Sequence, residues 1–571
     1  MIAPTMNPFP MHRLISPAAL LATMLAAPFA CAAPGSVQDG PPTTEPRAQP
    51  LATSPARADW RTSFVNPIFE GADPWVVQHD GYYYTTQSEA NRGIAVYRSR
   101  TLTDLGEKAI IWRAPEEGPH SRQIWAPEIH RIGERWYAYV AASDGRNENH
   151  RMIVLESEGD DPQGQYHFKA ELYTGDDLAG KTNNRWAIDG VPLELNGQLY
   201  HVWSGWADHQ DIQYLYIATM SDPWTISSNR VRLADNDDHL WERVDENAAG
   251  RGLHEAPQVL QRDGRTFIIY SASGSWQPSY KLGMLELAPA GDPMNPADWK
   301  KHPEPVFSPT DLALGTAHCT FITSPDGSEE WMLYHAKVDR QPGWRRAVHA
   351  KPFTWGDDGL PDFGTPPAPG NPLPLPSGQP PVAGEPLDAP VRDDFTEPFR
   401  QRWQYFGHQQ YVGQRDGRLF LGVKPREPVN IYRGGEKALL KNLAFADGTV
   451  SASVRVEAGE ADAGIMLRVQ HPAVGYDAQK GYFVGIVPGT DLVVAGKTDG
   501  TRWIELARAG APIETATDHR LSVEANGSRF TVRLDGETVL RFEDEDYTEG
   551  QVGLRVVDTL ASFDDVEVKG K

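Results

Sequence analysis

The sequence predicts an all-β chain, a five-bladed β-propeller followed by a β-sandwich of the jelly-roll type. Turn glycines recur about every sixty residues through the first half, which is typical of propeller blades. Short apolar or alternating runs flank these turns, and helical periodicity is almost absent. Alternating strands joined by tight hairpins fill the last third and predict the sandwich.

The repeat has two parts, a turn glycine and an aromatic residue three or four positions later. A lone four-stranded sheet cannot cover its own apolar faces, so successive units are expected to pack as blades around a central channel. The turn glycines are Gly81, Gly133, Gly197, Gly264 and Gly327, and the aromatic residues that follow are Tyr84, Trp136, Tyr200, Phe267 and Trp331.

A second repeated signal supports the blades. Four short apolar runs, at 94–99, 152–157, 215–221 and 282–287, are predicted to be third strands. Three of the four lead into Asp-Pro turns, which favour a reversal into an outermost strand.

The chain divides into five segments. An apolar run after Met11-His12-Arg13, with Ala30-Cys31-Ala32 as a cleavage site, predicts a signal peptide over 1–33. Its length is ordinary if translation begins at Met11 and ten residues too long if it begins at Met1. Composition then predicts a disordered tether, the propeller, a Pro-rich linker and the sandwich. Their bounds are 34–60, 61–363, 364–390 and 391–571.

Composition excludes several classes of function. The net charge is -23 and no basic stripe stands out, so no nucleic-acid partner is expected. No apolar run beyond the leader is long enough to span a membrane, so the mature chain is expected to be secreted or periplasmic. Cys31 lies in the leader, which leaves Cys319 without a partner for an intrachain disulfide. The sequence does not indicate the oligomeric state.

Polar residues stand at one phase of the repeat, eight or nine positions before the turn glycine. They are Asp73, Asp189, Glu255 and His318, and the second unit has Trp125 there. Equivalent positions of successive blades meet at one end of the channel, so these side chains are expected to share a pocket. Each Asp taken alone is better explained as turn chemistry. Their common phase favours a site.

Three carboxylates in one pocket fit hydrolysis of a glycosidic bond with inversion. That reaction needs an ionised general base and a protonated general acid about 6.5 to 9.5 Å apart. A third carboxylate beside the acid raises its pKa by repulsion between like charges. Asp73, Asp189 and Glu255 are the candidates for these roles.

Five ordered motifs over about 300 residues resemble glycoside hydrolase family 43. They begin at Asn66 and contain Ala72-Asp73-Pro74, Trp125-Ala126-Pro127-Glu128, Ile188-Asp189-Gly190, His254-Glu255-Ala256-Pro257 and Thr316-Ala317-His318. The resemblance implies a five-bladed propeller and inverting hydrolysis. It implies Asp73 as base, Asp189 as pKa modulator and orienting group, and Glu255 as acid.

The same resemblance implies further site residues. Members often hold a calcium or sodium ion through water near the position of His318, and the alternative is a hydrogen-bonded channel histidine. No cofactor is required for the chemistry. Arg346, in Arg346-Ala347-Val348-His349, resembles a substrate-facing arginine, and Trp125 is the candidate for sugar stacking. His254-Glu255 lacks the second histidine of a zinc protease helix.

The C-terminal segment shows an Asp535-Gly536 turn between two alternating strands over 530–542. It resembles concanavalin-like jelly-roll modules, some of which bind carbohydrate, and the alternative is a domain that only buttresses the propeller. The sequence does not show whether Trp403, Tyr432 or Tyr482 lies on a binding face.

We therefore expect an exo-acting glycosidase that removes α-L-arabinofuranosyl groups from plant-type polysaccharides or oligosaccharides. The pattern Trp203-Ser204-Gly205-Trp206 looks most like family members with that activity. A β-xylosidase is the nearest alternative. A retaining fructan hydrolase lacks support because its Asn-Asp-Pro-Asn-Gly opening is absent, and a sugar-binding protein with a dead site is opposed by the retention of all three carboxylates.

Overall fold

The computed structural model describes residues 59–208, 211–384, 389–423 and 433–571. The predicted signal peptide, nearly all of the predicted tether and Tyr432 lie outside the described residues. The described chain is nearly all β, and its one α-helix is α1 (Phe399–Arg402). None of its helices is long and apolar enough to cross a membrane.

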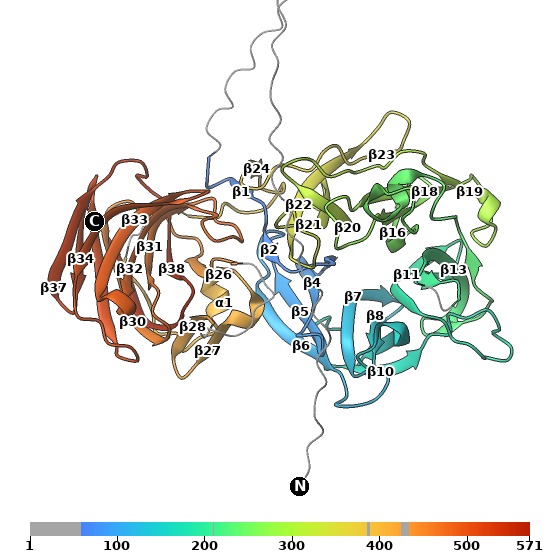
Figure 1. Cartoon of the computed structure of the whole chain (residues 1–571), viewed down its shortest axis with the longest axis horizontal. Helices are drawn as coiled ribbons and strands as arrows, with labels where there is room; N and C mark the ends of the chain where they lie inside the picture. The colour runs from blue at the N-terminus through green and yellow to red at the C-terminus, as the bar shows by residue number, and fades with distance from the viewer. Residues whose placement is uncertain (1–58, 209–210, 385–388, 424–432) are drawn as a thin grey trace, which may run out of the picture. The chain divides into compact units, whose positions relative to one another are not determined.

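Four antiparallel sheets follow one another in chain order, each running from an innermost to an outermost strand (Figure 1). The predicted third strands occupy the third position of each sheet. The strands are β3 (Trp75–His79), β4 (Tyr82–Ser88), β5 (Gly93–Ser99) and β6 (Glu107–Arg113); β7 (Arg122–Ile132), β8 (Arg135–Ser143), β9 (Arg151–Ser157) and β10 (Tyr166–Glu171); β11 (Ala187–Leu195), β12 (Gln198–Trp206), β13 (Gln213–Asp222), β14 (Thr225–Ile226) and β15 (Val231–Arg232); β16 (His254–Arg262), β17 (Arg265–Ala272), β18 (Lys281–Leu287) and β19 (Trp299–Lys301).

The fifth sheet closes the ring with a strand from the start of the chain. Its order is β20 (Leu314–Thr323), β21 (Glu330–Lys337), β22 (Arg346–Trp355) and β2 (Phe69–Glu70), with β23 (Pro361–Asp362) at the end of β22. Phe69 pairs with Val348, so residues far apart in sequence share one blade. The innermost strands contact one another in the order β3, β7, β11, β16, β20 and back to β3. The predicted five-bladed propeller is confirmed.

The predicted turn glycines lie between the first and second strands of the five blades. All five have φ between +63° and +76°, the left-handed region that favours glycine. Asp80, Asn196 and Asp263, each preceding one of these glycines, have positive φ as well, as a type I′ hairpin requires. A Cβ at any of the five glycines would meet no neighbour. Backbone conformation, rather than space, therefore selects glycine there.

The aromatic residues after these turns pack between blades. Tyr84 and Trp136 share one buried cluster between the first and second blades, and Trp331 lies in the cluster between the fifth and the first. Tyr200 and Phe267 occupy the clusters on either side of the fourth blade. Burial of such a side chain contributes about 2 kcal/mol, so the repeat stabilises four of the five interfaces between blades.

Two further sheets form the C-terminal domain. Apolar side chains from both sheets make one buried cluster, which confirms the sandwich. One sheet contains β27 (Val412–Arg415), β28 (Arg418–Gly422), β39 (Leu560–Gly570), β30 (Gly448–Ala458), β35 (His519–Asn526), β36 (Arg529–Leu534), β37 (Glu537–Glu543) and β25 (Val391–Asp393); the other contains β26 (Trp403–Phe406), β29 (Lys437–Leu440), β38 (Gln551–Val556), β31 (Ala463–Gln470), β32 (Lys480–Val487), β33 (Leu492–Asp499) and β34 (Trp503–Gly510).

Two of the aromatic residues considered for sugar binding belong to this core. Trp403 and Tyr482 are buried in the cluster between the sheets, so neither offers a ring face to a ligand. The predicted Pro-rich linker contains one short strand, β24 (Pro372–Pro374), which pairs with β1 (Ser63–Val65). Both strands of this pair have three residues, as expected where prolines remove backbone donors.

Candidate active site

The predicted site residues lie at irregularities in the innermost strands. Asp73, just before β3, has φ +52°, and Asp189 in β11 has the same value. The register of β16 shifts directly after Glu255, and that of β20 shifts across His318, whose φ is +45°. A β-bulge re-aims a side chain that regular pleating would point elsewhere. The same device thus recurs in separate blades and turns polar groups toward the channel.

The bulges require strained backbone. Ala126 and Ala256 have φ of +42° and +51°, in a region that costs an alanine about 1 kcal/mol or more. In return, the Ala256 N–H donates to Asp189 Oδ2 at 3.1 Å. The strained residue of the fourth blade therefore supplies a hydrogen bond to the carboxylate of the third blade.

Three side-chain nitrogens surround Asp73 Oδ1, and the Asp73 backbone N–H donates to one of them, His335 Nδ1, at 3.2 Å. Arg346 Nη1 lies 3.0 Å from its Oδ1, and Nδ1 of both His318 and His335 lies 3.2 Å from the same oxygen. Burial alone would raise the pKa of Asp73, but Arg346, then His318 and His335, outweigh it and hold that pKa well below its usual range. Asp73 is therefore the carboxylate that stays ionised.

The surroundings of Asp189, which include Glu255, shift its pKa in the opposite direction from that of Asp73. Burial, followed by the neighbouring charges of Glu255 and Asp73, raises the pKa of Asp189 well above its usual value. Glu255 Oε2 accepts a hydrogen bond from Gln213 Nε2 at 3.0 Å, and its buried Oε1 has no protein partner within the described chain. Asp189 therefore keeps its proton at pH values where an isolated aspartate has lost it.

The side chain of Tyr280 lies close enough to Asp73, Asp189 and Glu255 for the charge of each to affect its pKa. Burial first, and then the charges of Glu255, Asp189 and Asp73, raise the pKa of Tyr280 well above its usual value. Its ring stacks on His335 at 5.5 Å between centroids. The predicted convergence of these acidic side chains is therefore present in the fold.

Comparison with known proteins identifies the first domain. A family model described as glycosyl hydrolases family 43 matches residues 64–361, about half of the chain. The chain belongs to glycosyl hydrolase family 43. A second model, described as a 3-keto-alpha-glucoside-1,2-lyase-like domain, matches residues 403–569 in the sandwich.

Curated relatives of this family 43 chain are glycosidases, and so is the chain. Alpha-L-arabinofuranosidase 43 of Humicola insolens is 33% identical over 337 residues, which cover 56% of this chain and 67% of that protein. An extracellular exo-alpha-(1→5)-L-arabinofuranosidase of Streptomyces avermitilis is 33% identical over 336 residues, which cover 56% and 66%. A crystal structure of alpha-L-arabinofuranosidase from Lactobacillus brevis shares 31% identity with a TM-score of 0.49, over 53% of this chain and 97% of that one. The chain thus spans about two thirds of the length of these two curated relatives.

The two substrate-binding candidates differ in their surroundings. Arg346 holds Asp73, whereas the adjacent Arg345 pairs with Asp339 at 2.8 Å. Trp125 is half-buried, and one face of its indole stacks on His150 at 3.9 Å between centroids. In this family 43 site, therefore, Arg346 touches Asp73 directly, and Trp125 is packed against His150 and a buried apolar cluster while staying partly exposed.

Sequence reasoning missed three residues of the site. His335, in the second strand of the fifth blade, contacts Asp73. Gln213, at the start of β13, donates to Glu255. Tyr280, just before β18, lies near Glu255 and Asp189. None stands at the repeated phase of the innermost strands. Pairing offered a weak signal for His335 alone, because β21 lies beside β20 and His335 pairs with Ala317, next to His318.

The implied ion at His318 can be tested against the donors around it. Asp73 Oδ1 and nitrogens of His318 and His335 lie within 4.8 Å of one another. That oxygen already faces the Arg346 guanidinium at 3.0 Å, so a cation held by these three atoms would lie beside a permanent positive charge. The three atoms do not fit a directly bound metal ion. An ion held by His318 through water stays a prediction, and no step below uses one.

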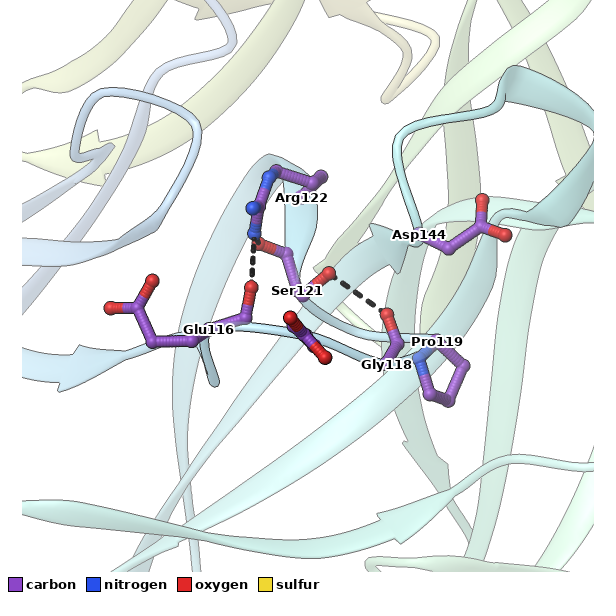
Figure 2. A pocket seen from close by; sticks show the side chains of 7 residues that line it. Glu116, Gly118, Pro119, Ser121, Arg122 and Asp144 are labelled. Atoms are coloured by element: carbon purple, nitrogen blue, oxygen red, sulfur yellow. Dashed lines mark hydrogen bonds between the residues drawn. The ribbon is translucent and has the colours of Figure 1, made fainter. Parts of the chain in front are cut away.

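A separate pocket of about 470 Å³ lies beside the start of β7 (Figure 2). Arg122 Nη1 donates to the carbonyl oxygens of Glu116 and Ser121 at 2.8 and 2.9 Å, and Ser121 Oγ donates to that of Gly118 at 2.8 Å. Arg122 Nη1 and Ser121 Oγ thus donate to backbone carbonyl oxygens of the loop that leads into β7. Glu116 and Asp144 add carboxylates to the lining, and we assign no catalytic group to this pocket.

Proposed function

We propose that this glycosidase is an inverting, exo-acting enzyme that releases α-L-arabinofuranosyl groups from plant-type polysaccharides or oligosaccharides. One observation carries the proposal: Arg346 and two histidines favour the ionised form of Asp73, whereas burial and the neighbouring charges of Glu255 and Asp73 raise the pKa of Asp189. Two carboxyl sites with opposite protonation are what general base and general acid catalysis of glycoside hydrolysis require.

In the proposed mechanism Asp73 is the base. Its contacts with Arg346, His318 and His335 all end on Oδ1, which leaves Oδ2 to accept a proton from water. The oxygen of that water forms a bond to the anomeric carbon as the glycosidic C–O bond breaks on the other side. The product sugar therefore has inverted anomeric configuration.

Glu255 is the proposed acid. It gives its proton to the departing glycosidic oxygen; afterwards Asp73 releases its new proton to solvent, and Glu255 takes one up from solvent. Asp189 is proposed as the pKa modulator: it lies close enough to Glu255 for the two carboxyls to interact, and the Ala256 N–H fixes its orientation. Trp125 is proposed to stack on the sugar with the exposed part of its ring.

Two findings support the choice of sugar and location. The curated relatives reported above are named as arabinofuranosidases, and one of them as extracellular and exo-acting on (1→5) linkages. We therefore propose arabinofuranosyl release outside the cytoplasm, following the leader that the sequence predicts. Mass spectrometry of the mature N-terminus checks export, with cleavage after Ala32 or Ala33 as the expected result.

The function is tested with small glycosides followed by NMR. We expect turnover of aryl α-L-arabinofuranosides to exceed that of aryl β-D-xylosides, and the first product to carry the inverted anomer. Preference for the xyloside would replace the proposed substrate with the β-xylosidase alternative. A retained anomer would reject Asp73 as a general base toward water.

A further inference from the structure

Trp344 is a large apolar side chain that the fold leaves in water. It is 62% exposed, in the loop between β21 and β22. Single exposed apolar residues are ordinary on protein surfaces. Trp344 differs because its indole is held in place and lies one side chain away from the proposed base.

A second tryptophan and a set of backbone contacts hold the ring. Trp344 lies 5.7 Å from the half-buried Trp276, with an angle of 55° between the ring planes. The Gly343 N–H donates to the Trp276 carbonyl at 2.8 Å, and Lys337 Nζ donates to the Gly343 carbonyl at 2.6 Å. A Cβ at Gly274 would lie 3.1 Å from the Trp276 ring, so glycine lets that indole fold back closely. The two loops therefore present a fixed pair of indoles.

The loops that carry this pair continue from, or lie next to, elements that contact the two proposed catalytic carboxyls. The Trp344 ring centroid lies 5.4 Å from Arg346 Cζ, and the same guanidinium reaches Asp73 at 3.0 Å. On the other side, Trp276 follows the end of β17, the strand in which Ser271 pairs with Glu255. The indoles thus lie at the rim of the site, between the strand beside the acid and the arginine beside the base.

We propose that Trp276 and Trp344 form a platform for the sugar residue on the leaving-group side of the scissile bond. This inference rests on the proposed exo-acting function. The terminal sugar must lie among the three carboxyls, so the remainder of the chain leaves the site over its rim. The acid protonates the leaving oxygen, which places the leaving sugar toward Glu255 and Trp276.

The chemistry of the platform selects the class of ligand. A sugar ring has one face of C–H groups that stacks on an indole, and a preformed aromatic surface loses little conformational entropy on binding. The substrate class is therefore an oligosaccharide or polysaccharide with a sugar as leaving group, in preference to a terminal arabinofuranosyl group on a small aglycone.

The test compares two substrates in matched variants. Linear α-1,5-arabinotriose has a sugar leaving group, and methyl α-L-arabinofuranoside has none. Aromatic anchors at interfaces typically cost more than 1 kcal/mol when truncated, so Trp344→Ala should lower the ratio of the two kcat/KM values about tenfold, mainly through KM of the triose. Trp344→Phe should keep most of the ratio. Phe168→Ala is the control, because Phe168 is 50% exposed on the outer strand β10 and contacts no residue of the site.

The outcomes separate the platform from the proposed function. An unchanged ratio in Trp344→Ala, with an unchanged melting temperature, overturns the platform. An equal loss on both substrates overturns it as well, because that result means that Trp344 only steadies Arg346 against Asp73. If the wild-type protein hydrolyses neither substrate, the proposed arabinofuranosidase function fails, and the platform fails with it.

Discussion

Replacing Arg346 with methionine should shift the acid limb of the pH profile. The guanidinium lies 3.0 Å from Asp73 Oδ1. Unit charges at about 3 Å in an effective dielectric constant of about 20 attract by roughly 5 kcal/mol, and an arginine beside an aspartate lowers its pKa by about 1 to 3 units in practice. Without that charge the pKa of Asp73 rises, so the base becomes protonated at higher pH as the solution is acidified. The acid limb of kcat/KM should therefore move up by about 1 to 3 pH units.

The neighbouring arginine supplies the control. Arg345 is 40% exposed and pairs with Asp339, so Arg345→Met removes the same charge from the next position without touching Asp73. The measurement is kcat/KM on an aryl α-L-arabinofuranoside across the acid range, with circular dichroism at each pH to confirm folding. An acid limb in Arg346→Met within about half a unit of wild type would refute our account of how Asp73 is kept ionised.

Three further outcomes are expected. Glu255→Gln should lower kcat about 10² to 10⁴-fold on oligosaccharides and less on dinitrophenyl glycosides, whose leaving group needs no proton; equal losses in steady-state assays of both would contradict the acid role. Gly197→Ala should lower the free energy of unfolding by about 1 to 2 kcal/mol because φ is +76° there, whereas Gly159→Ala, at an open position without a left-handed φ, should change it by less than about 0.5 kcal/mol in denaturant titrations. Chelation with EDTA should leave kcat unchanged, since Arg346 and two histidines hold Asp73; loss of turnover that calcium restores would place an ion in the mechanism.

Within the propeller, the sequence could predict the features that recur in every blade. Gly197 and Gly264 adopt a positive φ that favours glycine regardless of the surrounding residues. The local sequence alone therefore predicts each hairpin. Asp189 and Glu255 could be found because equivalent strands converge, and phase in the repeat stands in for position in space. His335 and Gln213 do not stand at the repeated position before a turn glycine. Only the pairing of strands in the fold brings them to Asp73 and Glu255.

The expectations for individual aromatic residues show the same limit. Trp125 was singled out by phase, and the structure adds that one face of its ring is already covered by His150. The sequence did not show whether Trp403 and Tyr482 lie on a binding face, because alternation along a strand does not tell which face meets the other sheet. Trp344 was not singled out, because its exposure and its contact with Trp276 are properties of the folded chain.

The site separates two protonation states with carboxyl groups of nearly identical intrinsic acidity. Asp73 and Asp189 occupy equivalent positions in their blades, each at φ +52°, so the backbone does not distinguish them. Their partners do. Asp73 receives a guanidinium and two imidazoles, and Asp189 receives a single backbone N–H and a second acidic side chain. Burial, which alone would favour the neutral form of both, is overcome at Asp73 by charge and reinforced at Asp189 by repulsion. A repeated fold thus supplies equivalent carboxylates, and the non-repeating residues around them give one the properties of a base and place the other beside an acid.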